Sequence, residues 1–317
     1  MKIGIYGYGN LGRAAEIVSG DFGITVSAVF TRRDPDSVRT LRAPVYRREC
    51  VRAFSEEIDC MLMCGGSYTD LRCDTPDVAR LFNTVDSFDI HSDIEKHREQ
   101  VDCAAKETEH TSVVAVGWDP GLLSVFRAYF SGIMPRGEVN TFWGRGVSQG
   151  HSEVIRSIKG VKRAVEYTVP QSEAVMLARV GRTVDKYVRH KRECYVVAEE
   201  CEQERIVREI KSIPEYYEGY ETDVHFIDEE EFIKNHLYMP HKGECIAFNM
   251  SGVYREHISR AEMSVALDSN PEFTASVMLA YAKACVGLNA EGCFGAFTAF
   301  DVAPRYLVSD AVAQKVI

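Results

Sequence analysis

A glycine-rich turn near the beginning of the chain constrains its fold more than any other feature. The segment IGIYGYGNLGRA places Gly7, Gly9 and Gly12 in G-x-G-x-x-G spacing, after an apolar run that predicts a strand and before a segment that predicts a helix. Glycines at this spacing permit a tight turn and let the backbone approach a pyrophosphate at the helix N-terminus. Because a second predicted strand ends about 20 residues later, the pattern indicates a dinucleotide-binding domain.

The first 120 residues alternate short apolar runs with segments of helical periodicity, and the strand candidates are KIGIYG, ITVSAVF, IDCMLMC, FNTVD and TSVVAV. This alternation predicts an α/β fold with a doubly wound parallel sheet, the Rossmann arrangement. Longer and more polar strands follow, which predict a second, α+β domain on an open mixed sheet. We expect residues 1–120, completed by 292–317, to form the dinucleotide-binding domain and 121–291 to form the substrate-binding and dimerisation domain. We expect the helix beginning at Pro271 and the last 25 residues to return toward the first domain, although the sequence alone does not fix this.

Composition and charge exclude several classes of protein. A net charge of −10 in 317 residues disfavours a nucleic-acid partner, which would require a basic surface. No window holds about 18 consecutive apolar residues, so we expect no spanning helix, no membrane partner and a cytoplasmic location. The ten cysteines form no C-x-x-C pair, which predicts reduced thiols and no metal site.

The end of the second predicted strand, VFTRRD, indicates which nicotinamide cofactor is bound. An NAD site usually places an acid here for the ribose 2′-hydroxyl, whereas arginine accommodates the 2′-phosphate of NADP. Thr31, Arg32 and Arg33 offer a hydroxyl and two guanidinium groups, which suit a phosphate dianion. The alternative is that both arginines are solvated beside Asp34 and Asp36. We favour NADP.

Other strand ends should border the same crevice, because ligands of such sheets bind outside the carboxyl ends of the strands. MCGGSYTD supplies residues 64–67, where two glycines permit close approach of the cofactor and Cys64 is a small wall residue. TVDSFD supplies Asp89 and VGWDPG supplies Asp119, a pair of carboxylates that suits a substrate ammonium. The alternative is that both acids cap helices, with Pro120 as the first helical residue after Asp119.

The second domain carries a complementary set of side chains. Arginine binds a carboxylate through two parallel hydrogen bonds, and threonine, asparagine and histidine can add further bonds. Each residue taken singly has an ordinary structural role, and spacing alone does not show that they converge. The set comprises Trp143, Thr168, Arg192, His241 and Asn270.

Ten segments resemble, in order, those of the NADP-dependent meso-diaminopimelate dehydrogenase family. The resemblance extends over almost the whole chain. They are GYGNLGR, FTRR, VDSFDIH, GWDPG, FWGRGVSQGHS, VKRAVEYTVP, HKREC, FIDEEEF, MPH and NPEFTAS…GAFT. The blocks GWDPG, FWGRGVSQGHS and NPEFTAS are far more specific than a Rossmann glycine pattern. The resemblance implies a homodimeric enzyme that binds NADP and a small amino-acid substrate.

The resemblance also implies roles for individual residues. The cofactor would contact Gly7, Tyr8, Gly9, Asn10, Leu11, Gly12, Thr31, Arg32, Arg33, Cys64, Gly65, Gly66, Ser67, Ser87, Phe88, Asp89, Val116, Gly117, Trp118, Asp119 and Pro120. The D-amino acid centre of the substrate would place its ammonium at Asp89 and Asp119, beside Trp118 and Trp143, and its carboxylate near Gln149 and Gly150. The L-centre would be held by Thr168, Arg192, His241 and Asn270.

The reaction implied is the reversible oxidative deamination of the D-centre of meso-2,6-diaminopimelate to L-2-amino-6-oxopimelate and ammonia. Asp89 or Asp119 would orient the amine and a water, and neither is assigned as the sole base. Two alternatives stay open, a reductase of the dihydrodipicolinate reductase or homoserine dehydrogenase type, and a non-catalytic NADPH-sensing protein. Lys242 departs from the family pattern beside His241, so substrate breadth is the property that the resemblance defines least.

Overall fold

The chain forms two units, and the first is built from both ends of the chain. It comprises Met1–Val125 and Pro271–Ile317, whereas the second comprises Phe126–Asn270. The structure is a computed structural model that describes residues 1–316, without the side chains of Gln149 and Asp310. The second unit is therefore an insertion into the sequence of the first.

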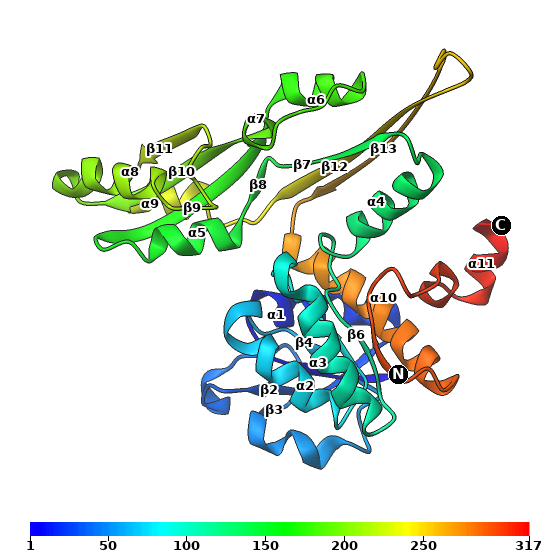
Figure 1. Cartoon of the computed structure of the whole chain (residues 1–317). Helices are drawn as coiled ribbons and strands as arrows, with labels where there is room; N and C mark the ends of the chain where they lie inside the picture. Colours follow the sequence, from blue (N-terminus) through cyan, green and yellow to red (C-terminus); the bar gives the residue numbers. More distant parts are fainter. Residues whose placement is uncertain (317) are drawn as a thin grey trace. The chain divides into compact units, whose positions relative to one another are not determined.

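Seven parallel strands form the sheet of the first unit (Figure 1), in the order β14-β6-β5-β4-β1-β2-β3. The order of β1 to β6 is that of the Rossmann fold, and β14 extends the sheet beside β6. The prediction of a doubly wound parallel sheet is confirmed. The strands are β1 (Lys2–Tyr6), β2 (Thr25–Thr31), β3 (Val45–Arg47), β4 (Cys60–Met63), β5 (Thr84–Asp86), β6 (Thr111–Val113) and β14 (Gly295–Phe297).

Alternate residues of the central strands enter cores on opposite faces of this sheet. Ile3, Ile5 and Leu62 join one cluster together with residues of α1 and α10, whereas Met61 and Met63 join a second cluster that contains residues of α2. Strands buried on both faces are apolar throughout, as the sequence runs are. The helices of this unit are α1 (Asn10–Val18), α2 (Arg72–Ala79), α3 (Ile94–Lys106), α10 (Asn270–Ala290) and α11 (Asp310–Val316), and α4 (Leu122–Ile133) crosses its boundary.

Helix α10 belongs to the first unit, although the domain boundaries predicted from the sequence place residues 271–291 in the second domain. Eight of its residues are buried, and Met278, Leu279 and Cys285 pack in the same core as β1 and β4. By length and composition alone α10 could cross a membrane. Its buried residues show that it is a core helix here, because its apolar surface already packs against the sheet.

The second unit contains two sheets where the sequence predicts one. A four-stranded mixed sheet has the order β11-β10-β9-β8, and a three-stranded antiparallel sheet has the order β13-β12-β7. The predicted strand over residues 140–149 divides at Gly144, which has a φ of 118° and where a Cβ would lie 2.0 Å from the carbonyl oxygen of Thr168. The chain therefore passes from one sheet to the other at a residue that only glycine fits.

The elements of the second unit carry most of the residues predicted to bind substrate. Its strands are β7 (Glu138–Trp143), β8 (Gly146–Val147), β9 (Val161–Pro170), β10 (His190–Ala198), β11 (Thr222–Phe226), β12 (His241–Ser251) and β13 (His257–Leu267). Its helices are α5 (Gln149–Arg156), α6 (Ser172–Arg179), α7 (Lys186–Arg189), α8 (Gln203–Lys211) and α9 (Glu229–Asn235).

Candidate functional site

The glycine-rich turn joins β1 to α1 and leaves the start of α1 uncrowded. Gly9 caps the helix without a side-chain hydrogen bond, and the first turn carries no acidic residue. A Cβ placed on Gly9 would meet no atom within 4 Å. Since the N-terminus of a helix carries a partial positive charge and unpaired N–H groups, this end of α1 fits a pyrophosphate.

The side chain of Tyr8 in this turn is already engaged within the protein. Its hydroxyl donates to the Glu16 carboxylate, which also accepts the backbone N–H groups of Leu41, Arg42 and Ala43 at 2.8–3.0 Å. Burial and the bond to Glu16 raise the pKa of Tyr8. The predicted contact of Tyr8 with the cofactor therefore depends on its backbone and not on its hydroxyl.

The three residues predicted to bind the 2′-phosphate adjoin the glycine-rich turn. Thr31 is buried at the end of β2, and its Oγ1 accepts the backbone N–H of Arg33 at 3.1 Å. The guanidinium of Arg33 donates to the carbonyl oxygen of Tyr8 at 2.5 Å, and that of Arg32 donates to Asp70 at 2.8 Å. Both guanidinium groups thus have partners in the segments that follow β1 and β4, and Arg32 keeps 65% of its side-chain surface exposed.

Asp70 holds the loop after β4, where residues 64–67 are predicted to line the cofactor site. The backbone N–H of Gly66 and the hydroxyl of Thr69 donate to its carboxylate at 3.1 and 3.0 Å, and Arg48 lies 3.3 Å away. Burial alone would raise the pKa of Asp70, but these groups keep it below its ordinary value. Burial raises the pKa of the Cys64 thiol to about 12, so this residue is a neutral wall and not a nucleophile.

Asp86, the last residue of β5, braces the loops after β5 and β6. Its Oδ1 accepts the backbone N–H groups of Phe88 at 3.1 Å and Ala115 at 2.9 Å, and its carbonyl oxygen accepts that of Val116 at 2.8 Å. Its Oδ2 lies 2.6 Å from Nε2 of His97, whose buried ring stacks on Phe88. One buried carboxylate therefore positions both loops that contain predicted cofactor residues, and His97 packs against it inside the protein.

The two carboxylates predicted to bind an ammonium follow neighbouring strands of one sheet. Asp89 follows β5, is exposed, and donates its backbone N–H to Ser67 Oγ at 3.1 Å, whereas Asp119 follows β6 and is half-buried. Asp89 does not cap a helix, because the N-cap of α3 is Asp93, and Asp119 lies outside α4, which begins at Leu122. The alternative of two helix caps is therefore wrong.

The segment that contains Asp119 forms a turn, and the expectation that Pro120 begins a helix is wrong. Trp118 and Gly121 pair as an isolated antiparallel bridge around Asp119 and Pro120. Gly121 has a φ of 123°, which lies outside the helical region, so α4 starts at the next residue, Leu122. Trp118 is buried.

In the second unit the structure gathers three predicted substrate residues around β8. Thr168 of β9 is the register partner of Gly146 on β8 and of Arg192 on β10. The ring of His241 lies against Gly146, where an added Cβ would be 2.4–2.6 Å from the imidazole atoms. Asn270 donates its backbone N–H to Met239, two residues before His241, at 3.1 Å.

Trp143 ends β7, the strand before β8, and α5 begins directly after β8. The backbone N–H of Trp143 donates to Nε2 of His190 at 2.8 Å, and the two rings are 5.4 Å apart. Gly150 is exposed in the first turn of α5, whose N-cap is Ser148. The side chain of Gln149 lies outside the described part of the chain. The side chain of Lys242 on β12 is exposed and lies on the opposite face of the strand from the buried His241.

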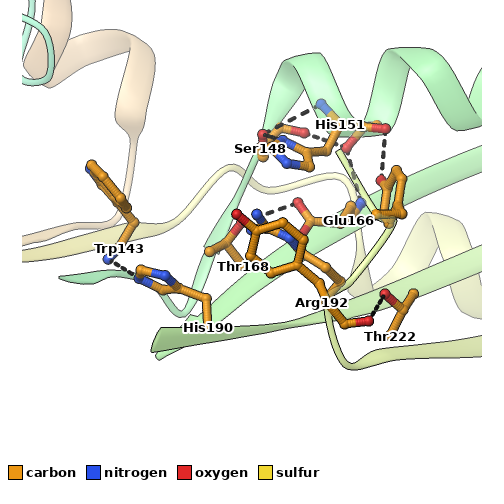
Figure 2. A network of polar contacts seen from close by, with 11 residues as sticks. Trp143, Ser148, His151, Glu166, Thr168, His190, Arg192 and Thr222 are labelled. Carbon is orange, nitrogen blue, oxygen red and sulfur yellow. Dashed lines mark hydrogen bonds and ion pairs between the residues drawn. The ribbon is translucent and has the colours of Figure 1, made fainter. Parts of the chain in front are cut away.

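Arg192 lies in a buried polar network that the sequence does not reveal (Figure 2). Its Nη1 donates to Thr168 Oγ1 at 2.7 Å and lies 3.7 Å from the carboxyl group of Glu166, and its guanidinium covers the ring of Tyr220. The Nε of Arg192 is buried and has no hydrogen-bond partner among the described residues. Glu166 is fully buried, and burial raises its pKa to about 8, against the opposing effects of Arg192 and Thr168.

His151 of α5 completes the network above Arg192. Its Nδ1 pairs with Ser148 Oγ at 2.6 Å, and burial, with Arg192 nearby, lowers its pKa to about 3. Its Nε2 is buried and has no hydrogen-bond partner in the part of the chain that the structure describes. Within residues 1–316, apart from the undescribed side chains, no group of three or more His, Cys, Asp or Glu residues is placed to hold a metal ion.

Comparison with known proteins shows which family has this arrangement. Residues 117–269 match the family described as the diaminopimelic acid dehydrogenase C-terminal domain. The meso-diaminopimelate D-dehydrogenase of Acetivibrio thermocellus is 46% identical over 97% of this chain and 94% of its own length. The chain belongs to the meso-diaminopimelate dehydrogenase family. It is therefore an amino-acid dehydrogenase.

Solved structures of diaminopimelate dehydrogenases share the whole architecture. The Corynebacterium glutamicum enzyme in complex with DAP has a TM-score of 0.93 and 36% identity, over 100% of this chain and 98% of that one. An engineered D-amino acid dehydrogenase bound to NADP+ has a TM-score of 0.89 and 35% identity, over 100% and 98%. The reaction class, a nicotinamide cofactor and a small-molecule substrate follow from membership of this family, and the sequence identification is confirmed.

Proposed function

We propose that this diaminopimelate dehydrogenase uses NADP to deaminate the D-centre of meso-2,6-diaminopimelate, giving L-2-amino-6-oxopimelate, ammonia, NADPH and a proton. The observation that carries the substrate assignment is Arg192, a buried guanidinium whose Nε lacks a partner among the described residues. Buried N–H donors are almost always hydrogen-bonded, so such a donor predicts a ligand acceptor. A carboxylate suits it best, because arginine binds carboxylates bidentately.

The far, L-configured centre is assigned to the group around β8. Arg192 and Thr168 would bind its carboxylate, and His241 and Asn270 would complete the pocket. The Corynebacterium glutamicum relative in complex with DAP supports diaminopimelate as the ligand, since it shares the fold at a TM-score of 0.93. A pocket that fits one configuration leaves its polar groups unpaired against the other, which rejects the wrong isomer.

The reacting D-centre is assigned to the strand ends of the first unit. Asp89 and Asp119 would bind its ammonium and accept the proton that must leave before the hydride is transferred. The nicotinamide ring would supply the hydride acceptor for Cα when bound, and water would hydrolyse the resulting imine to the ketone and ammonia. The bracing of residues 88, 115 and 116 by Asp86 supplies rigidity, because hydride transfer requires reacting atoms about 3 to 3.5 Å apart.

The preference for NADP is assigned to the end of β2. No acid occupies positions 31–33, and the guanidinium of Arg32, which pairs with Asp70, keeps most of its side-chain surface exposed to a 2′-phosphate. The NADP+ complex of the engineered relative supports this choice. A homodimer and a cytoplasmic location stay predictions.

A spectrophotometric assay of NADP+ reduction tests the proposal. We expect turnover of meso-diaminopimelate, little or none of the LL isomer, and none of homoserine. Comparable kcat/KM for the LL isomer would contradict the assignment of the far-end pocket. Reduction of NADP+ by homoserine, with none by meso-diaminopimelate, would instead identify a homoserine dehydrogenase activity.

A further inference from the structure

Glu166 is a carboxylic side chain without solvent exposure, directly behind two residues assigned to the far end of the substrate. It lies two residues before Thr168 on the same face of β9, and its carboxyl group faces Thr168 and Arg192 (Figure 2). Its backbone is also fixed, since its N–H donates to Ser152 Oγ at 2.9 Å and its carbonyl oxygen accepts the N–H of Ser148 at 3.1 Å. The position of this carboxyl group is therefore tightly defined.

The hydroxyl of Thr168 connects this carboxyl group to Arg192. Its Oγ1 lies 3.1 and 3.3 Å from the two carboxyl oxygens of Glu166 and accepts Nη1 of Arg192 at 2.7 Å. A hydroxyl has one proton to donate. When Glu166 is ionised, that proton is donated to Glu166, and the carboxylate also attracts the guanidinium. When Glu166 is neutral, its own proton can be donated to Thr168, and the threonine proton is free for a ligand.

We propose that Glu166 is a proton-linked specificity residue: as a neutral acid it leaves Arg192 and Thr168 free to bind the carboxylate of the far amino-acid centre, and as a carboxylate it competes for both. The inference rests on the proposed function, in which these two residues bind that centre. Glu166 does not need to touch the substrate. It is a positioning residue that acts through Arg192 and Thr168.

The surrounding groups leave Glu166 as the residue that titrates near neutral pH. Burial raises its pKa to about 8 despite the Arg192 charge, and a bound carboxylate that neutralises Arg192 would raise it further. Burial lowers the pKa of His151, on α5, to about 3, and it raises the pKa values of Cys194, on β10, and of Tyr217, before β11. Among these described groups facing Glu166 and Arg192, only Glu166 changes charge between about pH 6 and pH 10.

The test uses L-2-aminopimelate, which presents an L-centre but has no amine at the reacting end. Its competitive inhibition constant against meso-diaminopimelate reports the far-end pocket without any contribution from an ammonium at Asp89 and Asp119. We expect this constant to be flat below about pH 8 and to rise above it by up to about tenfold per pH unit, because binding then requires uptake of a proton. In Glu166→Gln, which cannot ionise, the constant should stay flat from pH 6 to pH 9.

Glu193→Gln is the matched control. It makes the same chemical change one residue from Arg192, but Glu193 faces the other side of β10, where it pairs with Arg145 and Lys191. This variant should follow the wild-type pH profile. A rise that persists in Glu166→Gln, or that disappears equally in Glu193→Gln, overturns the proposal.

Calorimetry of the wild-type enzyme gives a second measurement that does not depend on a folded variant. Binding of L-2-aminopimelate at pH 8.5, in two buffers of different ionisation enthalpy, should show uptake of a substantial fraction of a proton per ligand. An active enzyme with no proton uptake and a flat inhibition constant overturns the role of Glu166 while the proposed function stands. An enzyme that turns over no meso-diaminopimelate at any pH overturns the proposed function, and the role of Glu166 with it.

Discussion

Asp86→Asn should destabilise the first unit and weaken its predicted cofactor site, because it changes the one carboxylate that joins two loops. The wild-type side chain accepts backbone N–H groups from Phe88 and Ala115 and pairs with His97 at 2.6 Å, with no exposed surface. An asparagine can accept the two N–H groups through its oxygen, but it then meets His97 with an amide and no charge. The shape is retained while charge-assisted bonds become neutral ones.

The magnitude follows from the number of bonds affected. A hydrogen bond to a charged group contributes about 1.5–3 kcal/mol and a neutral one about 0.5–1.5 kcal/mol, so weakening three bonds should cost about 2–4 kcal/mol in total. For a domain of this size that corresponds to a fall in Tm of roughly 5–10 °C, measurable by calorimetry. The KM for NADP+ should rise as well, because residues 87–89 and 116–120 lose their shared anchor.

Asp89→Asn is the control for this prediction. It makes the same substitution three residues away on an exposed side chain, so its effect on unfolding free energy should stay within about 0.5 kcal/mol. Equal Tm values for the two variants would refute the reasoning that Asp86 is a structural brace. A stable Asp86→Asn enzyme with unchanged KM for NADP+ would refute the link to the cofactor site.

Three further outcomes are expected. Arg32→Ala should raise KM for NADPH by about tenfold and hardly change KM for NADH in initial-rate assays; an equal effect on both removes Arg32 from the phosphate site. Asp119→Asn should lower kcat/KM for meso-diaminopimelate by about 100-fold, with a smaller fall in Tm than Asp86→Asn, whereas the reverse order would make Asp119 structural. The pKa of Glu166 is raised in the folded protein, so its neutral form contributes stability below about pH 4.5 that is lost as pH rises to about 8. The free energy of unfolding, measured with urea, should therefore fall less between about pH 4.5 and pH 8 in Glu166→Gln than in the wild type, by up to about 5 kcal/mol. Parallel pH profiles of the two proteins would contradict the shifted pKa.

Local patterns predicted the features of the fold that local chemistry determines. The β1–turn–α1 unit was predictable because glycine spacing and hydrophobic periodicity both occur within twenty residues. The Asp119–Pro120 pair was not, because this dipeptide suits both a helix start and a turn, and the choice depends on the positive φ of Gly121. The helix at 270–290 is apolar on so much of its surface that composition did not show which core it enters.

The candidate site was predictable by residue type but not by arrangement. Thr168, Arg192 and His241 meet through the register of three strands that are separated by long connections, and no sequence spacing encodes that register. Glu166 was missed for a related reason. Glu166 lies on the same face of β9 as the exposed Lys162, so the sequence of that face resembles a solvated surface. In the structure, α5 covers the part of the face that contains Glu166.

The discontinuous composition of the first unit has a consequence for biosynthesis. Its sheet is completed by β14, and its core by residues 275–288 of α10 together with Ala299 and Val302. On the ribosome, the N-terminal 125 residues therefore emerge long before the helix and the edge strand that complete their core. The inserted unit, Phe126–Asn270, is synthesised in full first. The domain that begins the chain is thus the last one able to finish folding.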